Sequence, residues 1–206
     1  ALAWNLSRRA RGYPVSFEAE ALHLVTAFAP ASRSQALSDL LTSWDMKLTI
    51  LEQPTESAVF SGSPPTCFGC ARDRRRLLLT HAAEEGFTKV ALGHHMDDSL
   101  ITLLMNMSWN GELAAMPPKL SGREPGAPAI IRPLILLQEN VVARMVKDSG
   151  WPVEPCACPW AGDSRRIEAA AWLEMITDGS PKRKLNLWKS LTSQKTDLLP
   201  QPTGSP

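Results

Sequence analysis

Short apolar segments with strand character alternate along this sequence with longer segments of helical periodicity. The strand-like segments are residues 20–26, 47–51, 89–92 and 129–131. Helical spacing of apolar residues follows them in residues 34–44, 70–85, 98–109 and 139–149. Strands separated by helices are typical of parallel neighbours, because a crossover must bring the chain back to the same edge of the sheet. The alternation therefore predicts an α/β fold, a mostly parallel sheet with helices on both faces.

The composition of the chain changes after residue 150. Residues 1–150 are expected to form the α/β domain, which opens with a helix over residues 1–11. Pro152, Pro155 and Pro159 then interrupt regular structure before helical patterns at 164–177 and 181–191. The second predicted unit is a cysteine-containing helical segment, residues 151–191. Residues 192–206 are rich in Pro, Ser, Thr and Gln and are expected to be a disordered tail.

Charge and hydropathy exclude several classes of function. The net charge of the 206 residues is only +1, so any binding of nucleic acid must depend on local patches. No stretch reaches the ~20 apolar residues of a membrane span. The first eleven residues include three arginines and do not resemble a signal peptide. We expect a cytoplasmic protein without a membrane partner. Because the chain opens in a helix without an initiating Met, we also expect upstream sequence to be missing.

The four cysteines fall into two close pairs, Cys67/Cys70 and Cys156/Cys158. Without an export signal, such spacing favours metal or redox chemistry over disulfide bonds. The string Cys67-Phe68-Gly69-Cys70 can aim two thiolates at one metal centre but needs further ligands, for which Cys156 and Cys158 are the other thiols. The pattern alone leaves iron and zinc open. A redox pair of the thioredoxin type is disfavoured, since no strand leads directly into it.

A basic cluster follows the first cysteine pair. Arg72, Arg74, Arg75 and Arg76 cover more than one face of the predicted helix. A solvated basic surface is one interpretation. The other is that an RNA backbone docks here, next to the metal site.

The most informative string for chemistry is Gly93-His94-His95-Met96-Asp97-Asp98, which lies between a short apolar strand and a helix. Open α/β sheets bind their ligands at such strand exits. Gly93 permits close approach of a ligand, and Asp97 and Asp98 could hold Mg²⁺ on nucleotide phosphates. The alternative is structural: Asp98 caps the helix and the histidines pack.

Taken together in order, these strings resemble the tRNA 2-thiocytidine synthetase family of the ATP-pyrophosphatase (PP-loop, adenine nucleotide alpha hydrolase-like) superfamily. The resemblance covers about residues 67–166. The matching strings are Cys67-Phe68-Gly69-Cys70 with Arg72 and Arg74-Arg75, then Ala91-Leu92-Gly93-His94-His95-Met96-Asp97-Asp98, Asn110-Gly111, Ala115-Met116-Pro117-Pro118-Lys119-Leu120, Ile131-Arg132-Pro133-Leu134 and Pro155-Cys156.

The resemblance implies an ATP-dependent enzyme of tRNA thiolation. ATP would adenylate a cytidine in the anticodon loop, and sulfur would then replace its C2 oxygen with loss of AMP. The implied metal ligands are Cys67, Cys70 and Cys156, which would hold a [4Fe-4S] cluster. Asp97 and Asp98 would be catalytic with Mg²⁺, and Gly93 and His94 would bind the nucleotide. The implied RNA-binding residues are Arg72, Arg74, Arg75 and Lys119.

The resemblance also implies partners: tRNA, ATP and a sulfur donor such as a cysteine desulfurase, with a homodimer as one assembly it allows. Two related readings stay open. The chain could be an ATP-pyrophosphatase that acts on another tRNA base or on a metabolite, or it could be a zinc-binding RNA adaptor without catalysis.

The sequence departs from the family pattern at the phosphate-binding loop. The family's Ser-Gly-Gly-x-Asp-Ser string does not occur in these 206 residues. We expect the first strand and the PP-loop to be missing, and we expect this chain by itself to bind ATP weakly and not to thiolate tRNA. The segment 27–56 matches the family poorly, and Cys158 lies one residue closer to Cys156 than the family spacing, which leaves its role open.

Overall fold

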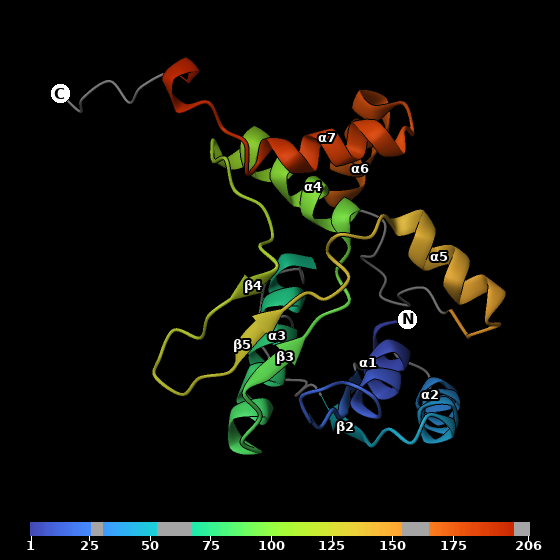
Figure 1. Ribbon diagram of the computed structural model, residues 1–206. Coiled ribbons are helices and arrows are strands. Elements are labelled where there is room, and N and C mark those ends of the chain that lie inside the picture. The colour runs from blue at the N-terminus through green and yellow to red at the C-terminus, as the bar shows by residue number, and fades with distance from the viewer. Residues whose placement is uncertain (26–30, 53–66, 154–164, 200–206) are drawn as a thin grey trace, which may run out of the picture.

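The computed structural model describes residues 1–25, 31–52, 67–153 and 165–199 (Figure 1). The elements in chain order are α1 (Leu2–Ala10), β1 (Ala21–Val25), α2 (Ala31–Ser43), β2 (Leu48–Glu52), α3 (Cys67–Glu84), β3 (Lys89–Ala91), α4 (Met96–Met105), the π-helical turn η1 (Asn106–Asn110), β4 (Lys119–Leu120), β5 (Ala129–Ile131), α5 (Glu139–Asp148), α6 (Arg165–Thr177), α7 (Pro181–Ser190) and the 3-10 turn η2 (Thr196–Leu198).

The described strands form two sheets. β1 pairs in parallel with β2, from Ala21 opposite Leu48 to Val25 opposite Glu52. In the other sheet β5 lies in the middle, parallel to β3 and antiparallel to β4. The α/β class and the parallel pairing predicted from the sequence are confirmed. β4 was not predicted, because its two exposed residues lie in a proline-containing segment that has no period.

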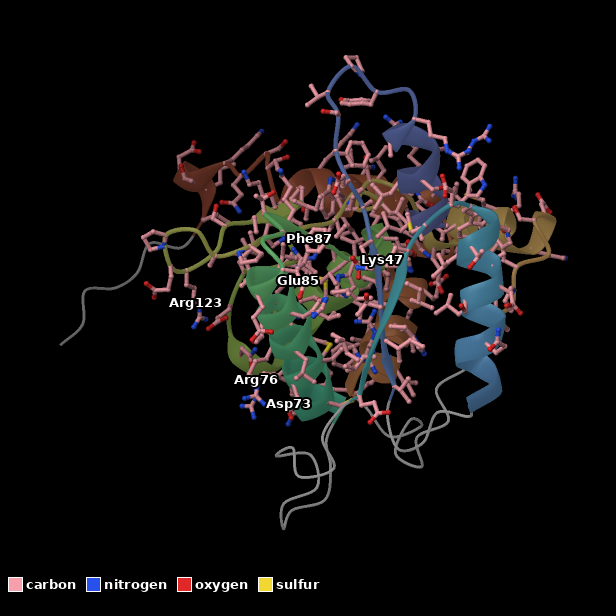
Figure 2. All side chains as sticks on the ribbon, turned by 90° about the horizontal axis from the view of Figure 1, so that it is seen from below. Lys47, Asp73, Arg76, Glu85, Phe87 and Arg123 are labelled. Carbon is pink, nitrogen blue, oxygen red and sulfur yellow. The ribbon has the colours of Figure 1, made fainter. Side chains whose placement is uncertain are left out.

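Helix α3 connects the first cysteine pair to strand β3. It begins at Cys67, three residues before the predicted start, and its C-terminus is closed at Gly86 as predicted. Gly86 has a φ of 75°, a left-handed conformation that favours glycine, and the next amide, of Phe87, donates to the carbonyl of Ala82 at 2.8 Å. Figure 2 shows Asp73 and Arg76 toward the cysteine end of this helix, with Glu85 and Phe87 at the other end.

The main core cluster joins α4 to α6. Its buried members are Met96, Leu100, Ile101 and Leu103 from α4, and Ala169 and Leu173 from α6. α7 packs on the same cluster through Leu187 and Trp188. Figure 1 shows α4, α6 and α7 gathered as one helical group beyond the ends of β3 and β5. The division into residues 1–150 and 151–191 stays a prediction, but these helices share a core.

This core gives a direct test of the packing. Leu173 is 2% exposed, whereas Ile167 on the same helix is 53% exposed. Leu173→Ala should lower the free energy of unfolding by about 3 kcal/mol, because it leaves a cavity between α4 and α6. Ile167→Ala should change it by about 0.5 kcal/mol or less. Urea unfolding followed by circular dichroism measures both, and equal effects would contradict the observed packing.

No described helix is both long and apolar enough to cross a membrane. The turn η2 lies within the segment 192–206, which was expected to be disordered. Residues 200–206 of that segment lie outside the described part of the chain. The disorder of the segment therefore stays a prediction.

Candidate functional site

The candidate site lies where β3 and β5 end. These strands are parallel neighbours, so their carboxyl ends share one edge, and the Leu92 amide continues the pairing by donating to the Ile131 carbonyl at 2.9 Å. The chain leaves β3 through Gly93 and His94 and leaves β5 at Arg132. The segment ending in Pro118 runs beside them, because the Arg132 amide donates to the Pro118 carbonyl at 2.8 Å. The structure thus brings together three of the strings recognised in the sequence.

The end of the Gly93–Asp98 string starts helix α4 through a reciprocal capping box. The His95 amide donates to Asp98 Oδ2 at 2.8 Å, and the Asp98 amide donates to His95 Nδ1 at 3.4 Å. Both interactions satisfy amides that have no partner within the helix. The helix therefore begins at Met96, two residues before the predicted start, with His95 as an N-cap that the usual cap preferences do not favour.

Asp97 is almost fully buried, at 2% exposure, and connects three helices. Its Oδ2 accepts from the Glu139 amide at 2.8 Å, which supplies the start of α5 with a partner. Its Oδ1 accepts from Lys184 Nζ of α7 at 2.7 Å. Lys184 also donates to Glu174 Oε1 at 2.5 Å. Burial opposes the charge on Lys184, but these carboxylates outweigh it and raise the pKa of Lys184 above its ordinary value.

Asp98 has a different set of partners. Besides its bond from the His95 amide, its Oδ1 accepts a hydrogen bond from Arg166 at the start of α6. Every carboxylate oxygen of Asp97 and Asp98 thus accepts at least one hydrogen bond within the protein. The structural alternative considered from the sequence, capping by Asp98, is present, while the Mg²⁺ and catalytic roles of both residues stay predictions.

His94 and Arg132 form a second polar pair at this edge. Arg132 Nε donates to His94 Nδ1 at 3.4 Å, and Arg132 Nη1 donates to the Pro117 carbonyl at 2.7 Å. Burial lowers the pKa of His94, and although Asp98 opposes that shift, Arg132 and Arg166 add to it. Burial, together with the charge of Arg75, also lowers the pKa of Arg132. The lowered pKa favours the neutral imidazole, which suits the role of His94 as the acceptor for Arg132.

The cysteine end of α3 is linked electrostatically to this edge. Cys70 is a half-buried free thiol, and Arg74 Nη2 lies 4.0 Å from its sulfur. Arg75, one residue on, influences both His94 and Arg132 through its charge. Among the described residues no group of three or more His, Cys, Asp or Glu side chains is placed to hold a metal ion. Cys156 and Cys158 lie outside the described part of the chain.

The other predicted RNA-binding residues are exposed. Arg72 and Arg74 lie on α3, and Lys119 lies on β4, where its backbone pairs with Ile131. Gly93 is also exposed and has no atom close to where a Cβ would stand. Their roles in binding RNA or nucleotide stay predictions.

Three residues of the site were not assigned a role from the sequence: Arg132, Arg166 and Lys184. Arg132 stood in one of the strings that carry the resemblance, so a signal was available. Lys184 lies 87 residues from Asp97, and its pairing has no local signature.

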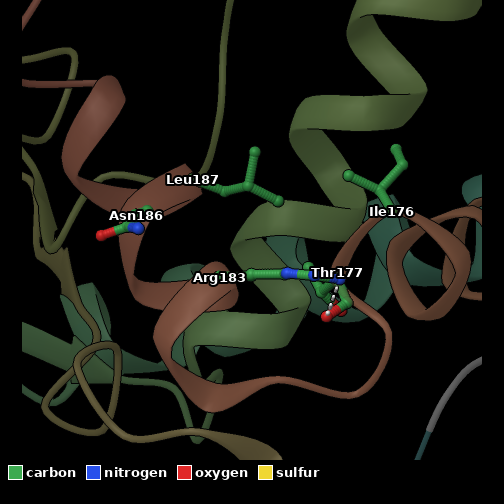
Figure 3. Close-up of a pocket in the computed structure, with 5 residues that line it drawn as sticks. All are labelled: Ile176, Thr177, Arg183, Asn186 and Leu187. Atoms are coloured by element: carbon green, nitrogen blue, oxygen red, sulfur yellow. Dashed lines mark hydrogen bonds between the residues drawn. The ribbon is translucent and has the colours of Figure 1, made fainter.

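Two hollows lie beside helices α5, α6 and α7. One of about 430 Å³ is lined by His95 and by residues of α5 and the chain after it, among them Val142, Val146 and Trp151. The other, of about 300 Å³, lies between the end of α6 and α7 (Figure 3). Its lining contains no residue predicted to be functional: Ile176, Thr177, Arg183, Asn186 and Leu187.

The fold and the strand-exit site define an α/β protein whose candidate ligand site lies where parallel strands end. A solved structure with the same fold is the U34-tRNA thiolase NcsA from Methanococcus maripaludis with its [4Fe-4S] cluster, which superposes with a TM-score of 0.76 at 17% identity over 100% of this chain and 73% of the other. At that identity the likeness concerns the fold. No protein-family model matches the chain.

Similarity in sequence to known proteins identifies a more specific group of proteins than the fold does. The chain is 37% identical over 184 residues to the tRNA-cytidine(32) 2-sulfurtransferase of Polynucleobacter necessarius, an alignment that covers 86% of this chain and 60% of that protein. It is 37% identical to the enzyme of that name from Deinococcus radiodurans and 38% identical to that from Stenotrophomonas maltophilia, covering 87% and 88% of this chain and 60% and 61% of those proteins. The predicted resemblance to the tRNA 2-thiocytidine synthetase family is confirmed. The chain spans about three fifths of the length of these relatives.

Proposed function

We propose that this chain belongs to a cytoplasmic, ATP-dependent tRNA sulfurtransferase that converts a cytidine of the anticodon loop to 2-thiocytidine. The observation that carries the proposal is the similarity at 37% identity to proteins named tRNA-cytidine(32) 2-sulfurtransferase. The arrangement of the site supports it, because the charge of Arg75, on the cysteine-bearing helix α3, acts on His94 and Arg132 at the strand exits.

The cysteines fit an iron–sulfur group. Cys67 and Cys70 both lie in the first turn of α3, where the helix dipole favours thiolates, and the Arg74 guanidinium beside Cys70 adds to that effect. Cys67, Cys70 and Cys156 would hold a [4Fe-4S] cluster, which would supply an iron with an open position for sulfur. Three arginines at the same end of α3, with Lys119, would hold the tRNA backbone.

In the proposed reaction the cytidine O2 attacks the α-phosphate of ATP, pyrophosphate leaves, and sulfur then displaces AMP from C2. Gly93 and His94 would contact the nucleotide. Asp98, whose side chain is 13% exposed, is better placed to meet Mg²⁺ than Asp97, at 3%. Asp97 would hold the loop in place through Glu139 and Lys184. A cysteine desulfurase would supply sulfur as a persulfide, and a two-electron thiol reductant would convert it to the sulfide-level sulfur that displaces AMP. A homodimer is the proposed assembly.

Mass spectrometry of tRNA nucleosides tests this function. A strain that lacks the gene should lose 2-thiocytidine and keep its other thiolated nucleosides, and the gene should restore the loss when supplied on a plasmid. Loss of a different thionucleoside would point to another tRNA base. Unchanged nucleosides would contradict tRNA thiolation and leave a metabolite as substrate or an adaptor role.

A further inference from the structure

Helix α7 and the segment after it carry a run of positive charge. Residues 179–196 contain five basic side chains and no acidic one, although the net charge of all 206 residues is only +1. The five are Lys182, Arg183, Lys184, Lys189 and Lys195. Like charges at this spacing repel one another, and a run of them without interspersed carboxylates is typical of a surface that binds a polyanion.

Two of these five cations are paired within the protein. Lys184 Nζ lies 2.7 Å from Asp97 Oδ1 and 2.5 Å from Glu174 Oε1, and its side chain is only 12% exposed. Arg183 Nη1 lies 3.8 Å from Asp178 Oδ2. The cations of the run that form no ion pair with any described residue are Lys182, Lys189 and Lys195, and all three are exposed. Their charges are therefore available to a partner.

The helical period places two of these lysines on one stripe. Lys182, Asn186 and Lys189 are four and three residues apart, so they lie on the same side of α7, and all are exposed. The opposite side of the helix packs on the core through Leu187 and Trp188. Figure 1 shows α7 on the outside of its helical group, at the end of the molecule away from α1. The stripe therefore faces solvent.

The stripe lies close to the candidate site. Lys184, on the inward side of α7, donates to Asp97 Oδ1 at 2.7 Å, and Asp97 lies in the first turn of α4, where the chain has just left strand β3. A helix with its side chains is about 10 Å across. A partner bound to the outward side of α7 would therefore lie about one helix diameter from this contact.

We propose that Lys182, Asn186 and Lys189, extended by Lys195, form a docking surface for the RNA backbone of a tRNA. The lysines would bind phosphates as point charges, and the Asn186 amide would donate to a phosphate or ribose oxygen. The stripe spans about 10 Å along the helix, enough to meet more than one phosphate of a strand. That the RNA is a tRNA rests on the function proposed above. The surface is separate from the RNA-binding residues predicted on α3 and β4.

Fluorescence anisotropy with a labelled, unmodified tRNA transcript tests this surface on the 206-residue chain. The double variant Lys182→Gln/Lys189→Gln should bind about tenfold more weakly at about 0.1 M salt, because two phosphate contacts are lost. The slope of log Kd against log salt concentration should fall by between about 1 and 2, since each lost contact releases about one counterion fewer. The Tm should be unchanged, because both side chains are exposed.

The matched control removes the same amount of charge elsewhere. Arg9 on α1 and Lys147 on α5 are exposed cations of other helices. Arg9→Gln/Lys147→Gln should leave both the affinity for tRNA and its salt dependence as in the unmodified chain. A labelled polyglutamate, measured on the same three proteins, distinguishes RNA from an acidic protein as the partner.

Equal affinity and slope in Lys182→Gln/Lys189→Gln and the unmodified chain would overturn the surface, as would equal losses in this variant and its control. Absence of tRNA binding by the unmodified chain would overturn it too. Loss of polyglutamate binding alone would assign the stripe to an acidic protein instead. None of these results bears on the nucleosides of the deletion strain. Unchanged nucleosides there would remove the thiolation proposal and leave measured RNA binding intact.

Discussion

Replacing Cys67, Cys70 or Cys156 by Ser is expected to remove most of the iron and sulfide from protein purified without oxygen. Serine lacks the soft thiolate that iron–sulfur clusters require, and a centre with three protein ligands has none to spare. Thiolation of tRNA should fall below detection in each variant. Iron and acid-labile sulfide analysis, together with the visible absorption of the cluster, measures the effect.

Cys158→Ser provides the matched control for these variants. Cys158 lies two residues from Cys156 and has no assigned ligand role, so this variant should keep its cluster. Unchanged iron and sulfide in all three ligand variants would contradict the assignment. Colourless protein with stoichiometric zinc would favour the adaptor instead.

Asp97→Ala is expected to lower the free energy of unfolding by about 3 kcal/mol, a typical effect of removing one partner from a buried ion pair. The substitution deprives Lys184 of its bond at 2.7 Å and the Glu139 amide of its bond at 2.8 Å. From the sequence, Asp97 was assigned to catalysis. The structure adds a reason to expect a large effect on folding, and the two effects are separable by measuring stability and turnover on the same variant.

The pair Lys184→Met and Lys182→Met controls for the loss of charge. Both lysines lie on α7, but Lys182 is exposed and Lys184 is bonded to Asp97, so only Lys182→Met should be neutral. Because the pKa of Lys184 is raised, its contribution should be present up to about its ordinary pKa of 10.5 and be lost only as the pH rises through the raised value. Urea unfolding as a function of pH measures this contribution to the free energy of unfolding. An equal loss of stability in Lys184→Met and Lys182→Met would contradict the role of the ion pair between Lys184 and Asp97.

Local features of the fold were largely predictable. The strand-like runs correspond to β1, β2, β3 and β5, because each is a short apolar stretch bounded by polar or turn residues. Gly86 ends α3 because a left-handed residue is required there. β4 escaped prediction, since its two residues pair with β5 through backbone atoms that leave no pattern in the side chains.

The sequence predicted where the candidate site lies, but not the hydrogen bonds and ion pairs that its residues make. The string from Gly93 to Asp98 marked the strand exit. Whether Asp97 faced a metal or Lys184 depended on contacts between residues 87 positions apart, which no local spacing encodes. The burial of Arg132 likewise depends on the segment around Pro117, which the sequence indicated only as a stiff loop.

The most direct test of the proposed function is thiolation of tRNA by the protein encoded by the complete gene, with its cluster reconstituted. An unmodified tRNA transcript, Mg–ATP and sulfide would be supplied, and nucleosides would be analysed by mass spectrometry. We expect one 2-thiocytidine and one AMP formed for each tRNA modified, with neither formed by the Cys67→Ser variant. AMP formation without 2-thiocytidine, or no dependence on Cys67, would contradict the proposal that this chain belongs to a tRNA sulfurtransferase.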